Sequence, residues 1–163
     1  MKKLAGTVIL ASLLVAPQLN PPVGSGHSAQ AAGVGVLGGT WRGNGRLNLE
    51  GGKYERLRCR AYYTSKNKGA KLGMAIRCAS PSYKIEIRSK LNIAGKSVSG
   101  SWEERNFNAA GSLTGTSRPG RLALSVNGAI KAGLFLTYSG SRQNVRLTGN
   151  FGSFRGLQLT LRK

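Results

Sequence analysis

Three glutamates come closer than any other residues of this sequence to the spacing of a catalytic pair. Glu103 and Glu104 end one predicted strand, and Glu86 lies on the strand before it. If Ala94-Gly95 forms the turn between these strands, Glu103 faces Glu86, while Glu104 points to the inner face beside Trp102. Two carboxyl groups about 5–9 Å apart can hydrolyse a glycosidic bond as general acid and base. Glycoside hydrolysis is therefore the first chemistry to weigh.

The charges around these glutamates argue against that chemistry. A general acid needs a raised pKa, but Arg77, Arg88 and Arg105 surround the facing pair, and positive neighbours keep carboxyl groups ionised. We therefore interpret the cluster as an ion-pair network on a basic sheet. Glu104 is expected at the rim, with Arg105 folding over it or a β-bulge reversing the alternation as alternatives.

Two residue types are scarce, and their scarcity narrows the chemistry further. The 163-residue sequence has no aspartate, and its single histidine, His27, lies in a segment expected to be removed. A Ser-His-Asp triad, a Cys-His pair, a histidine metal site and an EF-hand calcium loop are thereby excluded. A Ser-Lys pair stays open, because its members need not be adjacent in sequence. We predict that the protein is not an enzyme and has no catalytic residue, metal or cofactor.

Positive charge is the strongest feature of the composition. Lysine plus arginine number 25 against 5 glutamates, which gives a net charge of +20. On the strands predicted between residues 54 and 91 the cations share the outer face, where like charges opposite one another repel. This repulsion favours an anionic partner held by charge-assisted hydrogen bonds. A charge that keeps the protein soluble and guards open sheet edges is an equal alternative. The residues assigned to anion binding are Arg56, Arg58, Arg60, Arg77, Arg88 and Lys90.

The expected partner is an anionic polysaccharide or the head groups of anionic lipids. Nucleic acid is not expected, because single strands are usually held by exposed aromatic side chains that stack on bases. The alternation places only Tyr62, and as a further candidate Phe135, on the outer face.

The N-terminus has the pattern of a secretory signal peptide. Lys2 and Lys3 precede an apolar run over residues 4–16, and Ala29-Gln30-Ala31 has the small residues of a cleavage site. The run is shorter than a transmembrane helix, although an uncleaved anchor is the alternative. We predict a signal peptide over residues 1–31 and an exported, periplasmic or secreted protein without a transmembrane span after cleavage. Loss of Lys2 and Lys3 lowers the net charge from +20 to +18.

Two cysteines agree with export. Cys59 and Cys78 lack the C-x-x-C spacing of redox motifs, and an exported chain with two cysteines is expected to form one disulfide. If they face each other across a hairpin, the turn falls in residues 65–70, whose sequence SKNKGA suits a turn. Arg60 then lies opposite Arg77.

From Trp41 to the C-terminus, apolar and polar residues alternate with the period of two that marks strands. Glycine, asparagine or serine turns separate about ten short segments of this kind. Residues 32–40 are expected to form a flexible arm, and residues 41–163 a single domain. We predict an all-β fold, an antiparallel up-and-down meander of about 8–10 strands in a closed or nearly closed small barrel. A β-sandwich is the alternative.

A short motif opens the first strand. Gly39-Thr40-Trp41, with Gly43 and Gly45 behind it, resembles the G-x-W signature of lipocalins, avidins and related calycin barrels. In that group the tryptophan closes one barrel end and the interior can hold a small ligand. The resemblance implies a carrier of a small apolar ligand, while an interior filled by its own side chains is the alternative. The interior positions assigned to such a ligand are Trp41, Leu57, Met74, Ile87 and Trp102.

A longer resemblance spans residues 41–105. The ordered segments WRGNGRLNL, ERLRCRAYY, LGMAIRCAS, KIEIRSKL and SGSWEERNFNAAG look like those of a family of exported β-rich proteins from rhizobia and related alphaproteobacteria. The resemblance implies a periplasmic or secreted β domain and carries over no activity.

These features together predict a non-enzymatic exported binding protein whose cationic β surface engages an anionic envelope or host component. The alternatives are the calycin-like carrier and an inhibitor of a secreted enzyme, such as an acidic protease. An open barrel interior would favour the carrier.

Overall fold

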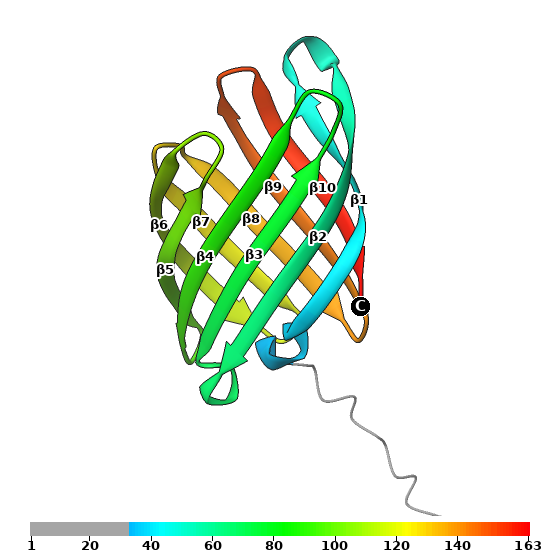
Figure 1. Ribbon diagram of the computed structural model, residues 1–163. Coiled ribbons are helices and arrows are strands. Elements are labelled where there is room, and N and C mark those ends of the chain that lie inside the picture. The colour runs from blue at the N-terminus through cyan, green and yellow to red at the C-terminus, as the bar shows by residue number, and fades with distance from the viewer. Residues whose placement is uncertain (1–32) are drawn as a thin grey trace, which may run out of the picture.

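Ten antiparallel strands follow one another along the chain and close into a barrel. A computed structural model describes residues 33–163, so the predicted signal peptide over residues 1–31 lies outside the described residues. Each strand pairs with the next, and the last pairs with the first, which closes the sheet (Figure 1). The strands are β1 (Gly39–Leu49), β2 (Tyr54–Lys66), β3 (Lys71–Ala79), β4 (Lys84–Ala94), β5 (Ser97–Glu104), β6 (Ala109–Arg118), β7 (Arg121–Gly128), β8 (Ala132–Ser139), β9 (Arg142–Phe151) and β10 (Phe154–Arg162). The predicted closed meander is confirmed, and the sandwich alternative is excluded.

The hairpin of β2 and β3 has the predicted register. Cys59 pairs with Cys78 and forms a disulfide, and Arg60 lies opposite Arg77. The chain turns through the short 3-10 segment η3 (Asn67–Gly69), inside the predicted turn. A disulfide is typical of proteins that leave the reducing cytosol, so this bond is consistent with export.

The hairpin of β4 and β5 corrects a predicted turn. Ala94 pairs with Ser97, so the turn residues are Gly95 and Lys96 rather than Ala94 and Gly95. Gly95 has a φ of 59°, and glycine at the first turn position suits a type II′ hairpin, which fits the twist of the flanking strands. The change of turn shifts every partner of β5 by two residues while keeping its inner and outer faces.

The segment before β1 closes one end of the barrel. Val34–Leu37 forms the 3-10 turn η1, and both Val34 and Leu37 are buried. The Trp41 Nε1 donates a hydrogen bond to the Leu37 carbonyl oxygen at 2.7 Å, and the Trp41 and Tyr63 rings pack edge to face. Within the predicted arm over residues 32–40, Val34 and Leu37 are thus packed on the barrel end, and β1 begins at Gly39. Figure 1 shows η1 at this end, next to the C-terminus.

Side chains fill this closed end completely. The Tyr63 hydroxyl donates to the Gln143 Oε1 at 2.8 Å inside it. Burial raises the pKa of the Tyr63 and Tyr138 phenols, so both stay protonated at neutral pH. The β2–β3, β4–β5, β6–β7 and β8–β9 turns lie at this end. Fully buried side chains near it include Leu37, Trp41, Leu72, Leu91, Leu122 and Leu161. This end of the barrel is therefore closed.

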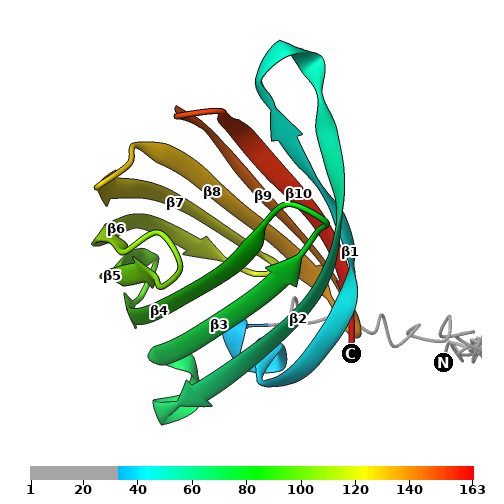
Figure 2. The same ribbon diagram turned by 45° about the horizontal axis from the view of Figure 1, so that its top comes forward.

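The opposite end carries the β1–β2, β3–β4, β5–β6, β7–β8 and β9–β10 connections. The β1–β2 hairpin, which turns through the 3-10 segment η2 (Glu50–Gly52), projects beyond its neighbours there (Figure 2). Within residues 33–163, no helix has the length and apolar character needed to cross a bilayer.

Candidate functional site

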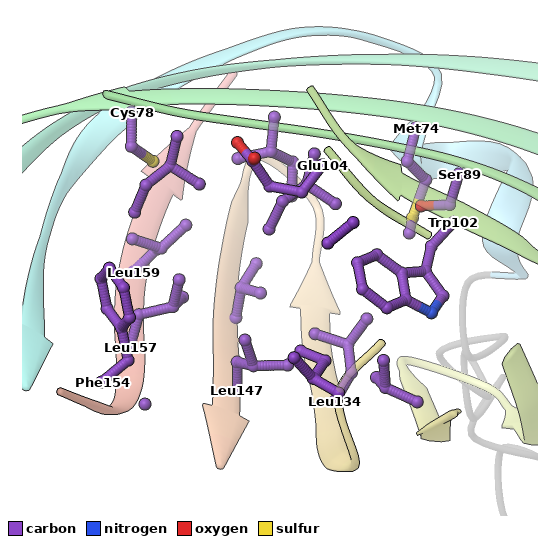
Figure 3. Close-up of a pocket in the computed structure, with 18 of the residues that line it drawn as sticks. Met74, Cys78, Ser89, Trp102, Glu104, Leu134, Leu147, Phe154, Leu157 and Leu159 are labelled. Atoms are coloured by element: carbon purple, nitrogen blue, oxygen red, sulfur yellow. The ribbon is translucent and has the colours of Figure 1, made fainter. Parts of the chain in front are cut away.

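The half of the barrel away from η1 contains a cavity of about 270 Å³. A barrel of eight strands is just wide enough for its own side chains to fill, and diameter grows with strand number, so ten strands can leave space inside. The lining consists almost entirely of aliphatic and aromatic side chains, as Figure 3 shows. Representative members are Met74, Ile87, Trp102, Leu134, Leu147 and Leu157.

The structure divides the five predicted interior positions between two regions. Met74, Ile87 and Trp102 line the cavity. Trp41 belongs to the closed end, and Leu57 is buried nearer the other end of β2, but neither lines the cavity. The alternation identified the inner face correctly, but position along the barrel axis depends on strand tilt and on the η1 plug.

Trp102 is fixed in the cavity wall by its ring nitrogen. Its Nε1 donates to the Asn127 carbonyl oxygen at 3.0 Å. The indole lies across the cavity from Phe154 and Leu157 (Figure 3). Ser89 lies between Met74 and Trp102 in the strand register and also lines the cavity. An indole held in this way can report on whatever occupies the space.

Glu104 lies on the inner face at the cavity rim, as one of the predictions placed it. It is buried, with 7% of its surface exposed. Its Oε1 accepts hydrogen bonds from the Glu86 N–H at 2.7 Å and the Asn106 Nδ2 at 3.2 Å, and its Oε2 accepts one from the Phe107 N–H at 2.6 Å. Arg105 does not fold over it. The carboxylate therefore anchors the β5–β6 loop, and both its oxygens already have partners.

The predicted opposition of Glu103 and Glu86 is wrong, because the β4–β5 turn differs. Glu103 lies opposite Arg88. Glu86 instead forms ion pairs with Arg88 at 2.7 Å, Arg77 at 3.2 Å and Arg105 at 3.9 Å. Hydrogen bonds from Arg77 and Arg88 hold the pKa of Glu86 below its ordinary value. The ion-pair network is confirmed, and no facing carboxylate pair forms from these two residues.

Four aromatic rings gather over the open end of the cavity, and sequence reasoning missed them. The Phe154 ring centroid lies 5.0 Å from that of Tyr83, 5.7 Å from Phe107 and 5.5 Å from Phe151. These residues come from three different hairpin connections, and all but Tyr83 line the cavity. A register shift between Phe154 and Gly156 breaks the alternation of β10. The signal available in sequence was Gly156, since glycine inside a strand often marks a bulge.

The predicted anion-binding residues also divide into groups. Arg58, Arg60 and Arg77 line one open groove of about 700 Å³ on the outer surface, together with Arg42 and Lys84. The other predicted cations lie outside this groove. Arg88 binds Glu86, Arg56 lies opposite Arg46, and Lys90 lies opposite Ser101.

Positive charge is concentrated on one side of the barrel. Strands β5, β6, β7 and β8 carry only two cations, Arg118 and Arg121, which flank the β6–β7 turn. All other lysines and arginines that lie in strands of residues 33–163 belong to β9, β10, β1, β2, β3 and β4. We call the outer face of β9, β10, β1, β2 and β3 the cationic wall. Because the barrel is closed, none of these cations guards an open sheet edge.

No protein-family model and no curated protein matches the chain. Among solved structures, the S-type phycobiliprotein lyase CPES from Guillardia theta is similar, with a TM-score of 0.58 and 9% sequence identity. The match covers 78% of this chain and 88% of that chain. The likeness shows the fold.

This match overturns the prediction that the protein is not an enzyme. A barrel of the same architecture belongs to a protein named as a lyase. The scarcity of histidine and aspartate was therefore no sufficient ground for excluding catalysis on this fold.

Proposed function

We propose that the barrel binds one small, largely apolar ligand in its cavity, as the calycin-like alternative implies. The single observation that carries this proposal is the cavity of about 270 Å³ with an apolar lining in the half of the barrel away from η1. The barrel likeness to the phycobiliprotein lyase supports the architecture on which the proposal rests.

The volume sets the size of the ligand. An apolar cavity of about 150 Å³ stays dry and binds benzene, while typical ligand pockets measure about 300–1,000 Å³. At about 270 Å³ this cavity fits a ligand of two or three aromatic rings or a short acyl chain. Each buried methylene contributes about 0.8 kcal/mol, so such a ligand is expected to bind at micromolar concentration.

The polar groups of the lining limit the ligand's chemistry. Both oxygens of Glu104 accept hydrogen bonds from the protein. Burying a ligand charge without a partner is costly. The lining therefore favours an uncharged ligand, with any polar atom placed near the Ser89 hydroxyl.

The neutral dye N-phenyl-1-naphthylamine tests this function. We expect saturable one-to-one binding with enhanced dye emission, accompanied by quenching of tryptophan fluorescence through energy transfer. The affinity for the dye should be unchanged in Trp41→Phe, whose indole lies in the closed end, and lower in Trp102→Phe, whose indole lines the cavity. Absence of saturable binding at micromolar concentrations would refute the proposal.

The second candidate function is binding of an anionic envelope or host component by the cationic wall, outside the cytoplasm. The observation that favours it is the concentration of cations on this wall and in its groove. Such binding would be electrostatic, so it should weaken steeply with salt.

Retention on heparin resin tests the second candidate. The triple variant Arg58→Glu, Arg60→Glu, Arg77→Glu should lose retention at low salt, because all three residues line the groove. The control Lys53→Glu, Lys96→Glu, Lys131→Glu makes the same change in net charge at exposed positions outside the groove and outside the wall strands, and should still be retained. Equal loss in both variants would mean that only total charge matters.

A further inference from the structure

Five arginines form a continuous row across five neighbouring strands of the cationic wall. The register places each one directly opposite the next. Neighbouring strands are about 4.8 Å apart, so the row is about 19 Å long. On β4, the strand after the row, the residue opposite Arg77 is Glu86. We call this set the arginine row; its members in order are Arg142, Arg162, Arg42, Arg60 and Arg77.

Little negative charge in the described chain offsets this row. All five glutamates of the sequence lie within residues 33–163, and the ion pairs among these residues join Glu86 to Arg77, Arg88 and Arg105, and Glu50 to Arg155. Of the row, only Arg77 therefore has a carboxylate partner. Like charges directly opposite one another destabilise a sheet, so the row lowers stability unless an outside anion binds it.

Solubility alone does not account for the row. Lysine would serve solubility as well as arginine, and the loops and turns do carry lysines such as Lys53, Lys68, Lys96 and Lys131. Every member of the row is arginine, whose planar fork binds carboxylate or sulfate through two parallel hydrogen bonds. All five are exposed, and Arg42, Arg60 and Arg77 line the groove.

We propose that the arginine row binds a linear acidic polysaccharide that lies across the strands, with one anionic group at each arginine. This inference rests on the second candidate function and specifies its ligand class and binding direction. The row follows the curve of the closed barrel, and a polysaccharide with one carboxylate per sugar carries charge along its whole length, so its anionic groups can reach successive arginines. The Tyr62 ring, on the same outer face two residues from Arg60, can pack against a sugar.

The wall is less suited to a membrane or a nucleic acid. Between the arginines its outer face carries Asn44, Asn144 and Thr160. Its exposed large hydrophobic side chains are Tyr54 and Tyr62 on β2, too few to insert the wall into a bilayer. Of the two exposed tyrosines on β2, Tyr54 is already covered by the Arg46 guanidinium, 4.3 Å from the ring centroid. One remaining ring does not make the stacking platform that single strands use.

Oligogalacturonates of defined length test the predicted span. Titration calorimetry at low salt should show affinity rising with each sugar up to about five, and then levelling, because five arginines are available. An affinity that continues to rise in proportion to length would indicate diffuse electrostatic attraction and would contradict binding at the arginine row. Tighter binding to anionic lipid vesicles or to oligothymidylate than to a pentagalacturonate would also overturn it.

Two triple variants with equal charge separate the row from the rest of the wall. Arg42→Ser, Arg60→Ser, Arg162→Ser removes the centre of the row and should weaken pentagalacturonate binding at least tenfold. Arg46→Ser, Arg56→Ser, Arg146→Ser removes three exposed arginines from a neighbouring line interrupted by Gln158, and should weaken it less than threefold. Equal losses of affinity in the two variants would disprove binding at the arginine row, although the cationic wall could still bind an anionic partner. No binding of any polyanion by the unaltered protein would disprove both.

Discussion

Replacing Ala109 with tryptophan should weaken binding of N-phenyl-1-naphthylamine more than tenfold. Ala109 lines the cavity at the start of β6, opposite Glu104. An indole at this position takes a large share of a space of only about 270 Å³. Displacing two methylene equivalents of the dye from apolar surroundings costs about 1.6 kcal/mol, and 1.4 kcal/mol is a tenfold change in affinity.

The neighbouring residue supplies a matched control. Ala110 is exposed on the outer face, so Ala110→Trp adds the same side chain without entering the cavity. Dye binding by this variant should match that of the unaltered protein. Both variants should unfold cooperatively at temperatures close to the original, because filling a cavity commonly stabilises a fold. Unchanged dye affinity in a folded Ala109→Trp variant would place the dye elsewhere and contradict the proposed ligand site.

If the barrel binds the proposed ligand, the aromatic cluster at the open end of the cavity lies on the path of its release. Phe154 touches rings from the β3–β4 and β5–β6 connections, and Phe107 is 51% exposed. Glu104 fixes the backbone that carries Phe107. The loop is thus held while the ring can rotate, a motion that exposed side chains make within nanoseconds. Entry therefore needs no opening of the barrel wall.

Alternation and pairing were sufficient to predict the architecture. The two cysteines fixed the β2–β3 register, since a disulfide can join only close neighbours, and the whole pairing from Arg58 to Lys66 followed from it. The inner face of each strand followed from the period of two, including the buried positions of Met74 and Trp102. Both inferences use local rules that tertiary structure rarely overrides.

Alternation and cysteine pairing do not predict how far along the barrel axis each residue lies. Trp41 shares the inner face with Met74 but lies in the closed end, away from the cavity. Strand tilt and the η1 plug decide which inner positions meet, and neither leaves a period in the sequence. The arginine row was missed for a related reason, because the β1–β10 closure brings Arg162 beside Arg42 from opposite ends of the chain.

Gly43→Ala should lower the free energy of unfolding by more than about 3 kcal/mol. Gly43 lies on the inner face of β1, opposite Leu161 of β10. A methyl group there would clash with the Thr160 carbonyl oxygen and would meet the Leu161 Cα at 2.9 Å. Both are backbone atoms, which cannot move aside as a flexible side chain can. The added carbon would therefore have to break the pairing that closes the barrel.

Urea and thermal unfolding would measure this effect against Asn44→Ala, the next residue on the same strand. Asn44 is exposed on the outer face, so its truncation should change the melting temperature by no more than a few degrees, as surface substitutions usually do. Gly43→Ala should lower it by more than about 10 °C or abolish cooperative unfolding. A melting temperature equal to that of Asn44→Ala would contradict the close crossing of β1 and β10. Closure of the barrel would then not explain why residues 43 and 45, after Trp41, are glycines.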